Sequence, residues 1–396
     1  MSENIINQRK PAGLVLFLLV LSQFLATSLW FAGNAVFHEL KEVISTKNDL
    51  TAALTISVQS GFILGTLIYA VFTIPDRYSP SKVFFVSAIL AALSNVLITI
   101  STDFYSLVTL RFLTGFFIAG IYPVGMKIAS DWFKGRLGNA LGFLVGALVL
   151  GTSFPHLVHS TTMGVSWKIV LISTSCLAII GGLIVNYLIG DGPNRKPMKQ
   201  FSLKALNGLF RKKRFRQASY GYFGHMWELY AFWAFVPAML TIFSEEHMMG
   251  LNISQWTFVI IASGSLGCIV GGLISRKYDS CKLAFVSLFI SGICSLSFYF
   301  LIPVSAELFI SFLVVWGFFV IMDSPQFSSV IADSAPLEYI GSALTIVNCI
   351  GFAITIVSIQ LVEYFEYLGS ARYYVLFFGP LFGLFPTWKV AGFGNS

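Results

Sequence analysis

Charged side chains are scarce in this sequence. Only 11% of its 396 residues are Asp, Glu, Lys or Arg, whereas soluble globular proteins have about 25%. Hydrophobic residues make up 56% of the chain, and the mean hydropathy is +0.80. Too few charges remain to cover a soluble surface, and disorder needs the opposite composition of low hydrophobicity and high charge. The composition therefore indicates a membrane protein with many spans.

The sequence also lacks the patterns of metal sites, disulfide frameworks and nucleotide-binding loops. Its five cysteines show no CxxC or histidine-paired spacing, and four of them lie inside apolar segments. A glycine-rich P-loop ending in Gly-Lys-Ser or Gly-Lys-Thr is absent, which argues against ATP-driven transport by this chain alone. The apolar spans show no pairing of a nucleophile with a base. We therefore expect no enzyme activity, no cofactor and no metal.

Long apolar runs divide the chain into twelve candidate transmembrane helices. A helix needs about 20 apolar residues to cross the ~30 Å hydrocarbon core. This pattern predicts an all-α membrane protein with two pseudo-symmetric six-helix bundles, an N-terminal half over residues 1–189 and a C-terminal half over residues 217–396. A cytoplasmic linker over 190–216, with nine basic residues and one acid, joins them. The predicted spans are 14–37, 54–74, 83–100, 105–126, 137–158, 167–189, 218–243, 256–275, 283–304, 308–331, 340–362 and 373–388.

The distribution of lysine and arginine sets the predicted orientation. If both termini are cytoplasmic, the cytoplasmic segments hold 20 of the 25 basic residues and the outer loops hold 4, while Arg111 lies within a span. Positive residues concentrate on the cytoplasmic side of membrane proteins. We therefore expect a multi-pass protein of the cell inner membrane with both termini in the cytoplasm. The basic residues lie between apolar runs and not on one soluble surface, so no nucleic-acid partner is expected.

The two predicted halves contain matching segments. Residues 77–87 align with residues 277–287 at an offset of 200, with five identities that include polar residues. Residues 115–117 align with residues 317–319 at an offset of 202. Parallel six-helix halves of this kind are one architecture of secondary transporters, which bind their substrate near the membrane midplane between the halves.

Local motifs in both halves resemble the major facilitator superfamily over nearly the whole chain. Arg111 begins a run that resembles the RxxxG motif of the family's fourth helix. Asp76 and Arg77 resemble the family's loop motif between helices 2 and 3, and Arg276 and Asp279 repeat it in the second half. The resemblance implies that these four loop residues take part in gating while the two halves rock about a central site.

Two departures from the family patterns bear on the substrate. The glycine-rich fifth span, with glycines at 142, 146 and 151, lacks the Gly-Pro pair expected of drug antiporters, which makes drug export a weaker interpretation. Residues 155–157, 190–193 and 224–230 resemble bacterial members of the nitrate/nitrite and cyanate carrier group. Nitrate carriers have an arginine in helices 2 and 8, which the corresponding spans here lack in their cores. We therefore do not expect nitrate as the leading substrate.

Three ionisable residues lie deep in predicted spans. Arg111, Glu228 and Asp323 fall on the fourth, seventh and tenth spans, which line the cavity in the superfamily. Ionisable groups inside a membrane are costly and usually face an interior or a water-filled cavity. We therefore expect the three to meet at a solute site. Arg111 could bind an anionic group or hold the fourth helix in place, and Asp323 could pair with Arg111 or bind a cation.

Neighbours of the deep charges complete the candidate site. His225 lies three residues before Glu228 and so on the same helix face. A histidine and a glutamate in one cavity can exchange a proton near neutral pH, so we expect Glu228, assisted by His225, to carry a coupling proton. A purely structural pair is the alternative. Trp30 and Asn34 on the first span and Tyr230 on the seventh are candidates for solute contact, or else for packing between helices.

Together these features predict a secondary active transporter that moves a small organic solute by alternating access with proton coupling. The solute is expected to be anionic because Arg111 offers a fork of donors. An efflux carrier for drugs or for a metal-chelating, siderophore-like molecule is the alternative if the cavity is wide and apolar, and a channel and a receptor are further alternatives. The expected partners are the solute, protons and the lipid bilayer, and we expect a monomer.

Overall fold

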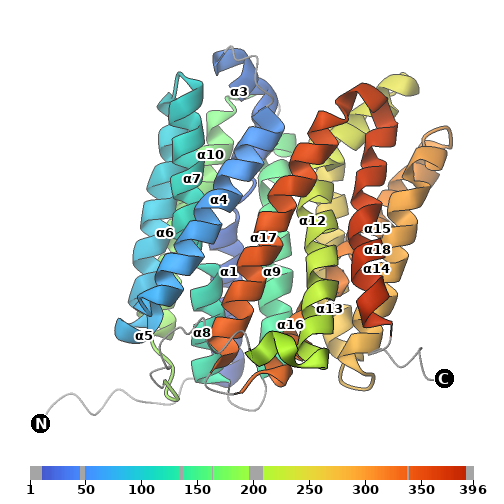
Figure 1. The fold of residues 1–396 in the computed structure, drawn as a ribbon. Coiled ribbons are helices and arrows are strands. Elements are labelled where there is room, and N and C mark those ends of the chain that lie inside the picture. The colour runs from blue at the N-terminus through green and yellow to red at the C-terminus, as the bar shows by residue number, and fades with distance from the viewer. Residues whose placement is uncertain are drawn as a thin grey trace, which may run out of the picture.

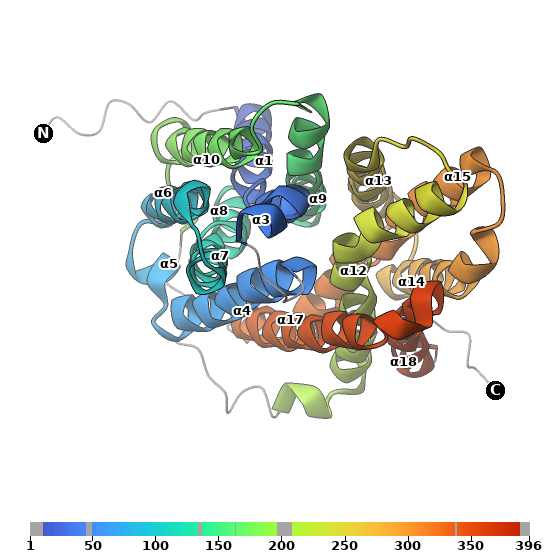
Figure 2. The ribbon, with the colours of Figure 1, turned by 90° about the horizontal axis from the view of Figure 1, so that it is seen from above.

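The fold consists of helices arranged in two groups. The computed structural model describes residues 11–44, 50–133, 137–162, 164–195, 208–336 and 339–388, and in these residues it contains no strand. The N-terminal helices lie beside one another in one group and the C-terminal helices in a second, and α4 and α17 lie side by side where the groups meet (Figures 1 and 2). The predicted all-α membrane fold is confirmed.

Short helices and helix breaks interrupt both halves. The N-terminal half contains α1 (Ala12–Thr27), α2 (Ala32–Ala35), α3 (Phe37–Ile44), α4 (Leu50–Val71), α5 (Ile74–Arg77), α6 (Pro80–Leu97), α7 (Phe104–Ile118), α8 (Tyr122–Trp132), α9 (Leu137–Thr161) and α10 (Lys168–Leu183). The C-terminal half contains α12 (Lys213–Glu246), α13 (Ile253–Ile274), α14 (Ser280–Ser297), α15 (Ala306–Met322), α16 (Ser324–Ser334), α17 (Ile340–Tyr364) and α18 (Phe378–Thr387). A π-helical segment, Ile184–Ile189, continues α10, and 3-10 segments occupy Ile98–Ile100, Phe298–Leu301 and Glu366–Phe377.

The helices match the predicted spans in order. In the described residues, 11 helical segments are long and apolar enough to cross a membrane, and α1 is a shorter apolar helix of 16 residues. The first span is short because the helix breaks after Thr27 and resumes as α2. The helix that opens the second half, α12, begins at Lys213, four residues before the predicted start of that half. The linker residues 196–207 lie outside the described residues.

Proline breaks one long helix in each half at the same place. Pro123 occupies the first turn of α8, directly after α7, and Pro325 occupies the first turn of α16, directly after α15. Proline has no backbone N–H and cannot continue a preceding helix, but it fits the first turn of a new one. The break in the second half puts Asp323 between two helices, where it ends α15 and precedes α16.

Glycines set the spacing of helices inside each half. A Cβ atom on Gly115 of α7 would overlap the backbone carbonyl of Val58 on α4, and one on Gly61 would overlap the carbonyl of Phe112. Gly317 of α15 stands in the same relation to the carbonyl of Ile260 on α13. Small residues allow this close approach between helices in membranes. The aligned glycines at 115 and 317 therefore have the same packing role in the two halves.

We predict that Gly115→Val separates α4 from α7 and destabilises the protein, because the new side chain has no space beside Val58. Overpacking of this kind costs about 1–3 kcal/mol. The measurement is the thermal unfolding of the purified protein in detergent. Gly13→Ala is the control, since a Cβ at Gly13 meets no atom within 4 Å. Equal melting temperatures for Gly115→Val and the wild type would contradict this packing role.

Candidate functional site

A cavity of about 350 Å³ lies between the two halves, and its walls come from α8 and α9 on one side and α12, α13, α16 and α17 on the other. Figure 1 shows α16 near the end of the bundle where α5 lies, with α3 at the opposite end. We refer to these as the α5 end and the α3 end. The cavity opens toward the α5 end, where the lining residues Arg276 and Asp333 are exposed. Its deeper walls carry Tyr122, Tyr222 and Asn348.

Four buried aromatic rings meet between the halves, one turn beyond the cavity wall at Asn348 on α17. We call Trp30, Phe62, Tyr230 and Phe352 the aromatic plug. Ring centroids are 4.8 Å apart for Trp30 and Phe62, 5.7 Å for Trp30 and Tyr230, and 4.7 Å for Phe62 and Phe352. Two of these rings come from each half, and each is at most 4% exposed. The plug therefore separates the cavity from the α3 end.

On the α3 side of the aromatic plug, hydrogen bonds join neighbouring helices. Gln59 on α4 and Thr355 on α17 lie one turn closer to the α3 end than Phe62 and Phe352, and the Thr355 hydroxyl donates to Gln59 Oε1 at 2.6 Å. This hydrogen bond joins the two halves. Within the N-terminal half, Asn34 Nδ2 donates to Thr55 Oγ1 at 2.7 Å. Two of the predicted solute-contact residues, Trp30 and Tyr230, thus lie in the plug. The third, Asn34, forms its hydrogen bond with Thr55 on the α3 side of the plug.

A histidine links the two halves at the α3 end. His159 Nε2 lies 2.7 Å from Glu39 Oε1, and His159 Nδ1 lies 2.7 Å from Ser254 Oγ on α13. A carboxylate only accepts hydrogen bonds, so Nε2 donates to Glu39 and, in the neutral ring, Nδ1 accepts from Ser254. We call these three residues the outer latch. In the described structure the cavity is thus exposed at the α5 end, whereas the plug and the latch lie between it and the α3 end.

The buried acid Asp323 pairs with His225 of α12. His225 Nδ1 lies 2.8 Å from Asp323 Oδ1, and the two side chains are 0% and 1% exposed. The pair lies next to the cavity wall, because Ser324 lines the cavity and the ring of Tyr222, another lining residue, is centred 5.7 Å from the His225 ring. The helix break at Asp323 therefore brings an ionisable pair to the edge of the cavity.

The other buried acid, Glu228, has a different partner. Its Oε1 atom accepts a hydrogen bond from Trp316 Nε1 on α15 at 2.8 Å. Trp316 also packs against Phe232, with ring centroids 4.5 Å apart. Glu228 therefore has its hydrogen-bond partner within the C-terminal half. His225, three residues earlier on α12, contacts Asp323 and not Glu228.

The buried Arg111 binds backbone carbonyls. Its Nη1 donates to the Leu29 carbonyl at 3.2 Å and its Nη2 to the Trp30 carbonyl. These carbonyls lie in the break between α1 and α2, where a helix leaves its last C=O groups without internal partners. Among the described residues no contact joins Arg111 to Asp323, which was one of two possibilities for Asp323, and Arg111, Glu228 and Asp323 make three separate contacts. These contacts are of the kind expected for the packing alternative of Arg111.

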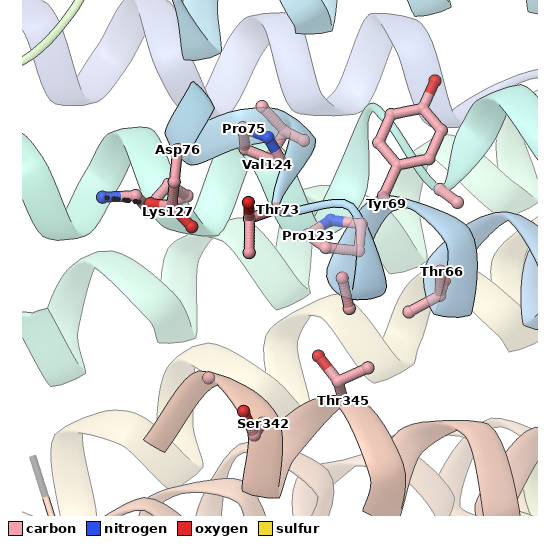
Figure 3. Close-up of a pocket in the computed structure, with 13 residues that line it drawn as sticks. Thr66, Tyr69, Thr73, Pro75, Asp76, Pro123, Val124, Lys127, Ser342 and Thr345 are labelled. Atoms are coloured by element: carbon pink, nitrogen blue, oxygen red, sulfur yellow. Dashed lines mark ion pairs between the residues drawn. The ribbon is translucent and has the colours of Figure 1, made fainter. Parts of the chain in front are cut away.

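The predicted gating residues lie at the α5 end. Figure 3 shows Asp76 next to Lys127, whose Nζ is 3.5 Å from Asp76 Oδ1 and 2.9 Å from Asp131 Oδ1. A hollow of about 150 Å³ beside them is closed on its other side by Ser342 and Thr345 of α17 (Figure 3). Asp76 is therefore positioned next to the helix of the other half.

The remaining three loop residues make different contacts. Arg77 and Arg276 are exposed, and Arg276 lies at the cavity mouth. Asp279 accepts hydrogen bonds from the backbone N–H groups of Cys281 and Lys282, and so caps α14. Asp279 Oδ2 is also 3.8 Å from Nη2 of Arg214, at the start of α12.

The contacts of Asp191 and Arg195, which follow α10 and its π-helical extension, were not predicted from the sequence. We call these two residues the strap. Asp191 Oδ1 accepts hydrogen bonds from the Ser79 and Ser81 hydroxyls at 2.9 Å each. Arg195 donates to the backbone carbonyls of Asp76 and Tyr78 at 3.0 and 2.6 Å. The strap ties the loop around α5 to the rest of its half. Its sequence signal is the Gly-Asp-Gly-Pro run after α10, in which Gly190 has a φ of 74°.

The sequence comparison identifies the family. Residues 15–359 match the model of the Major Facilitator Superfamily. The chain therefore belongs to this superfamily, and it is a multi-pass membrane protein of the secondary transporter class. This membership points to a transporter and not to an enzyme. No curated protein matches the chain.

We predict that Arg111→Met destabilises the protein, because the Leu29 and Trp30 carbonyls lose their donors. Each buried polar group left without a partner costs about 1–3 kcal/mol. Thermal unfolding in detergent measures the effect, with the exposed Arg77→Met as the control. A protein with unchanged stability and abolished solute binding would instead assign Arg111 to the solute site.

The outer latch is predicted to weaken in acid. The hydrogen bond from His159 lowers the pKa of Glu39 below its ordinary value of 4.5. A lowered pKa in the folded protein stabilises it above that ordinary value, and the contribution is lost as the pH falls through the folded pKa. The contribution is at most about 1 kcal/mol because the pair is partly exposed. Melting temperatures of the wild type and Glu39→Gln between pH 7 and pH 3 should converge as the pH falls. A constant difference would contradict this role.

Proposed function

We propose that the chain is a proton-coupled secondary transporter for a small organic solute, with Asp323 and His225 as the coupling pair. The observation that carries the proposal is the 2.8 Å contact between these two buried side chains at the edge of the cavity. An acid and a histidine in contact can hold one proton between them or give it up, and histidine titrates near neutral pH. Solute and proton would then reach neighbouring sites from the same opening.

The geometry favours Asp323 over Glu228 as the main proton carrier. Asp323 is followed directly by the cavity-lining residue Ser324, and its partner is ionisable. Glu228 accepts from an indole N–H, which does not titrate, inside one half. We retain Glu228 as the second candidate for the coupling proton, and variants of both acids are part of the test.

Alternating access gives each seal a role in the proposed cycle. The open cavity, the closed aromatic plug and the closed outer latch correspond to one end of the cycle. Opening toward the α3 end requires the Gln59–Thr355 hydrogen bond and the His159–Ser254 contact to break while the α5 end closes. Asp76, Lys127 and the start of α17 flank a hollow that closes in that movement. The loop residues Arg77, Arg276 and Asp279 remain candidate gating residues.

The cellular setting of the proposed transporter follows from the distribution of basic residues. Both termini, and the α5 end with them, are proposed to be cytoplasmic, in a monomer of the inner membrane. The open cavity then faces the cytoplasm. The likeness to the nitrate/nitrite and cyanate carrier group is retained as a proposal about the subgroup. The export alternative needs a wide apolar cavity, and the volume of about 350 Å³ does not favour it.

We predict that Asp323→Asn abolishes accumulation of solute driven by a proton gradient but retains exchange of solute across the membrane. The amide keeps the shape of the acid but cannot release a proton. Proteoliposomes with an imposed pH gradient measure accumulation, and counterflow at equal pH measures exchange. Asp333→Asn is the matched control, because Asp333 is an exposed acid at the cavity mouth.

Parallel variants distinguish the two acids. Glu228→Gln should keep a proton-driven response if Glu228 is structural, because the amide oxygen can still accept from Trp316 Nε1. Proton-driven accumulation that persists in Asp323→Asn and disappears in Glu228→Gln would move the coupling role to Glu228. Accumulation that persists in both single variants and in the double variant would reject proton coupling through these acids.

A further inference from the structure

We propose that the transported solute is uncharged and rich in oxygen, a small molecule bearing hydroxyl or amide groups, and that it is bound by neutral side chains. This inference rests on the proposed function, because it takes the cavity between the halves as the solute path. It replaces the expectation of an anionic solute, which depended on Arg111.

The interior of the cavity carries neutral hydrogen-bonding groups. Besides Ser324, its lining includes the hydroxyls of Tyr122 and Tyr222 and the amides of Gln326 and Asn348. Amides and hydroxyls both donate and accept hydrogen bonds. The charged lining residues in the described chain are at the exposed mouth. A solute with hydroxyl or amide groups can therefore donate hydrogen bonds to these lining side chains and accept hydrogen bonds from them.

The cations near the path, the buried Arg111 and the partly buried Lys127, are already engaged by other groups. Arg111 donates to two backbone carbonyls, and Lys127 is paired with Asp131 and Asp76. The buried acid nearest the cavity, Asp323, is paired with His225. Burying an ion without an opposite charge is strongly unfavourable. Among the described lining residues of the cavity, the charged ones are Arg276 and Asp333 at the exposed mouth, so an ionic solute would meet only neutral side chains deeper inside.

Unpartnered donors beyond the cavity indicate the same chemistry. Three neutral N–H groups on the path between the halves, Trp30 Nε1, Gln59 Nε2 and Trp233 Nε1, have no hydrogen-bond partner among the described residues. Each side chain is at most 1% exposed. Trp30 belongs to the aromatic plug, and the Trp233 ring is centred 5.1 Å from the plug residue Tyr230. A solute oxygen passing the plug would give these donors an acceptor.

The aromatic plug supplies the apolar part of the proposed contact. The rings of Trp30, Tyr230 and Phe352 pack against one another in this structure. When the plug opens, their flat faces would suit the C–H surfaces of a compact polar molecule. The cavity volume of about 350 Å³ is at the small end of ligand pockets, which span roughly 300–1,000 Å³. Both features favour a small solute over a bulky amphipathic one.

The test compares uncharged and charged probes of similar size on the full-length protein. Xylitol, glucose and nicotinamide form the uncharged arm, and lactate, succinate and choline form the charged arm. Binding is measured by the shift in melting temperature in detergent, and transport by counterflow in proteoliposomes. We expect at least one uncharged probe to bind and to be transported, and the three charged probes to do neither.

Variants connect the binding to the named groups. Asn348→Leu and Gln326→Leu should each weaken binding of the uncharged probe at least tenfold. Gln255→Leu, an exposed amide near the α3 end of α13, should leave it unchanged. Trp30→Phe keeps an aromatic ring in the plug and removes its N–H, so it should slow transport while the melting temperature without solute stays the same.

Separate outcomes overturn the inference and the proposed function. Binding of a charged probe, or of none of the uncharged ones, overturns the uncharged solute class. Binding of an uncharged probe that is unaffected by Asn348→Leu and Gln326→Leu overturns the assignment to this cavity. Proton coupling is decided independently, by the response of the Asp323 and Glu228 variants to a pH gradient.

Discussion

A polar group buried in a membrane-embedded bundle needs a partner inside the protein, because hydrocarbon offers none. This constraint explains the contacts at both helix breaks. Where α1 ends before α2, the Leu29 and Trp30 carbonyls receive donors from Arg111 of α7. Where α15 ends before α16, Asp323 meets His225 of α12. In each half, a polar side chain from a neighbouring helix thus makes contact where one helix ends before the next begins.

The same constraint separates rigid contacts from contacts that can open. Inside each half, helices touch backbone to backbone at Gly115 and Gly317, and such contacts allow little movement. Between the halves, α9 packs along α13 and α4 along α17, and the described side-chain contacts include the aromatic plug, the Gln59–Thr355 hydrogen bond and the outer latch. Ring contacts and single hydrogen bonds can be exchanged for contacts with solute or water at modest cost. In the proposed cycle, the halves move as units while their interiors stay packed.

Much of the fold could be predicted from the sequence, whereas the partners in the site could not. Apolar run lengths gave the spans, and the repeat put Gly115 and Gly317 at matching positions in the two halves, where the structure has matching helix contacts. Helix periodicity put His225 and Glu228 on one face of α12. In the structure that face meets two different partners, because Glu228 contacts Trp316 and His225 contacts Asp323. Which neighbour each side chain reaches depends on the rotation and depth of the second helix. Spacing along a single chain does not carry that information.

The sequence by itself determined the membrane class, the two-half architecture and the presence of costly ionisable groups inside the spans, because length, hydropathy and charge are local properties. Only the tertiary structure decided that Arg111 serves a helix break, that Asp323 pairs with His225, and that Glu39, His159 and Ser254 form one latch. Each of these contacts joins residues distant along the chain. Their geometry follows from how whole helices pack, since the lowest-energy partner of a buried polar group is set by every helix around it.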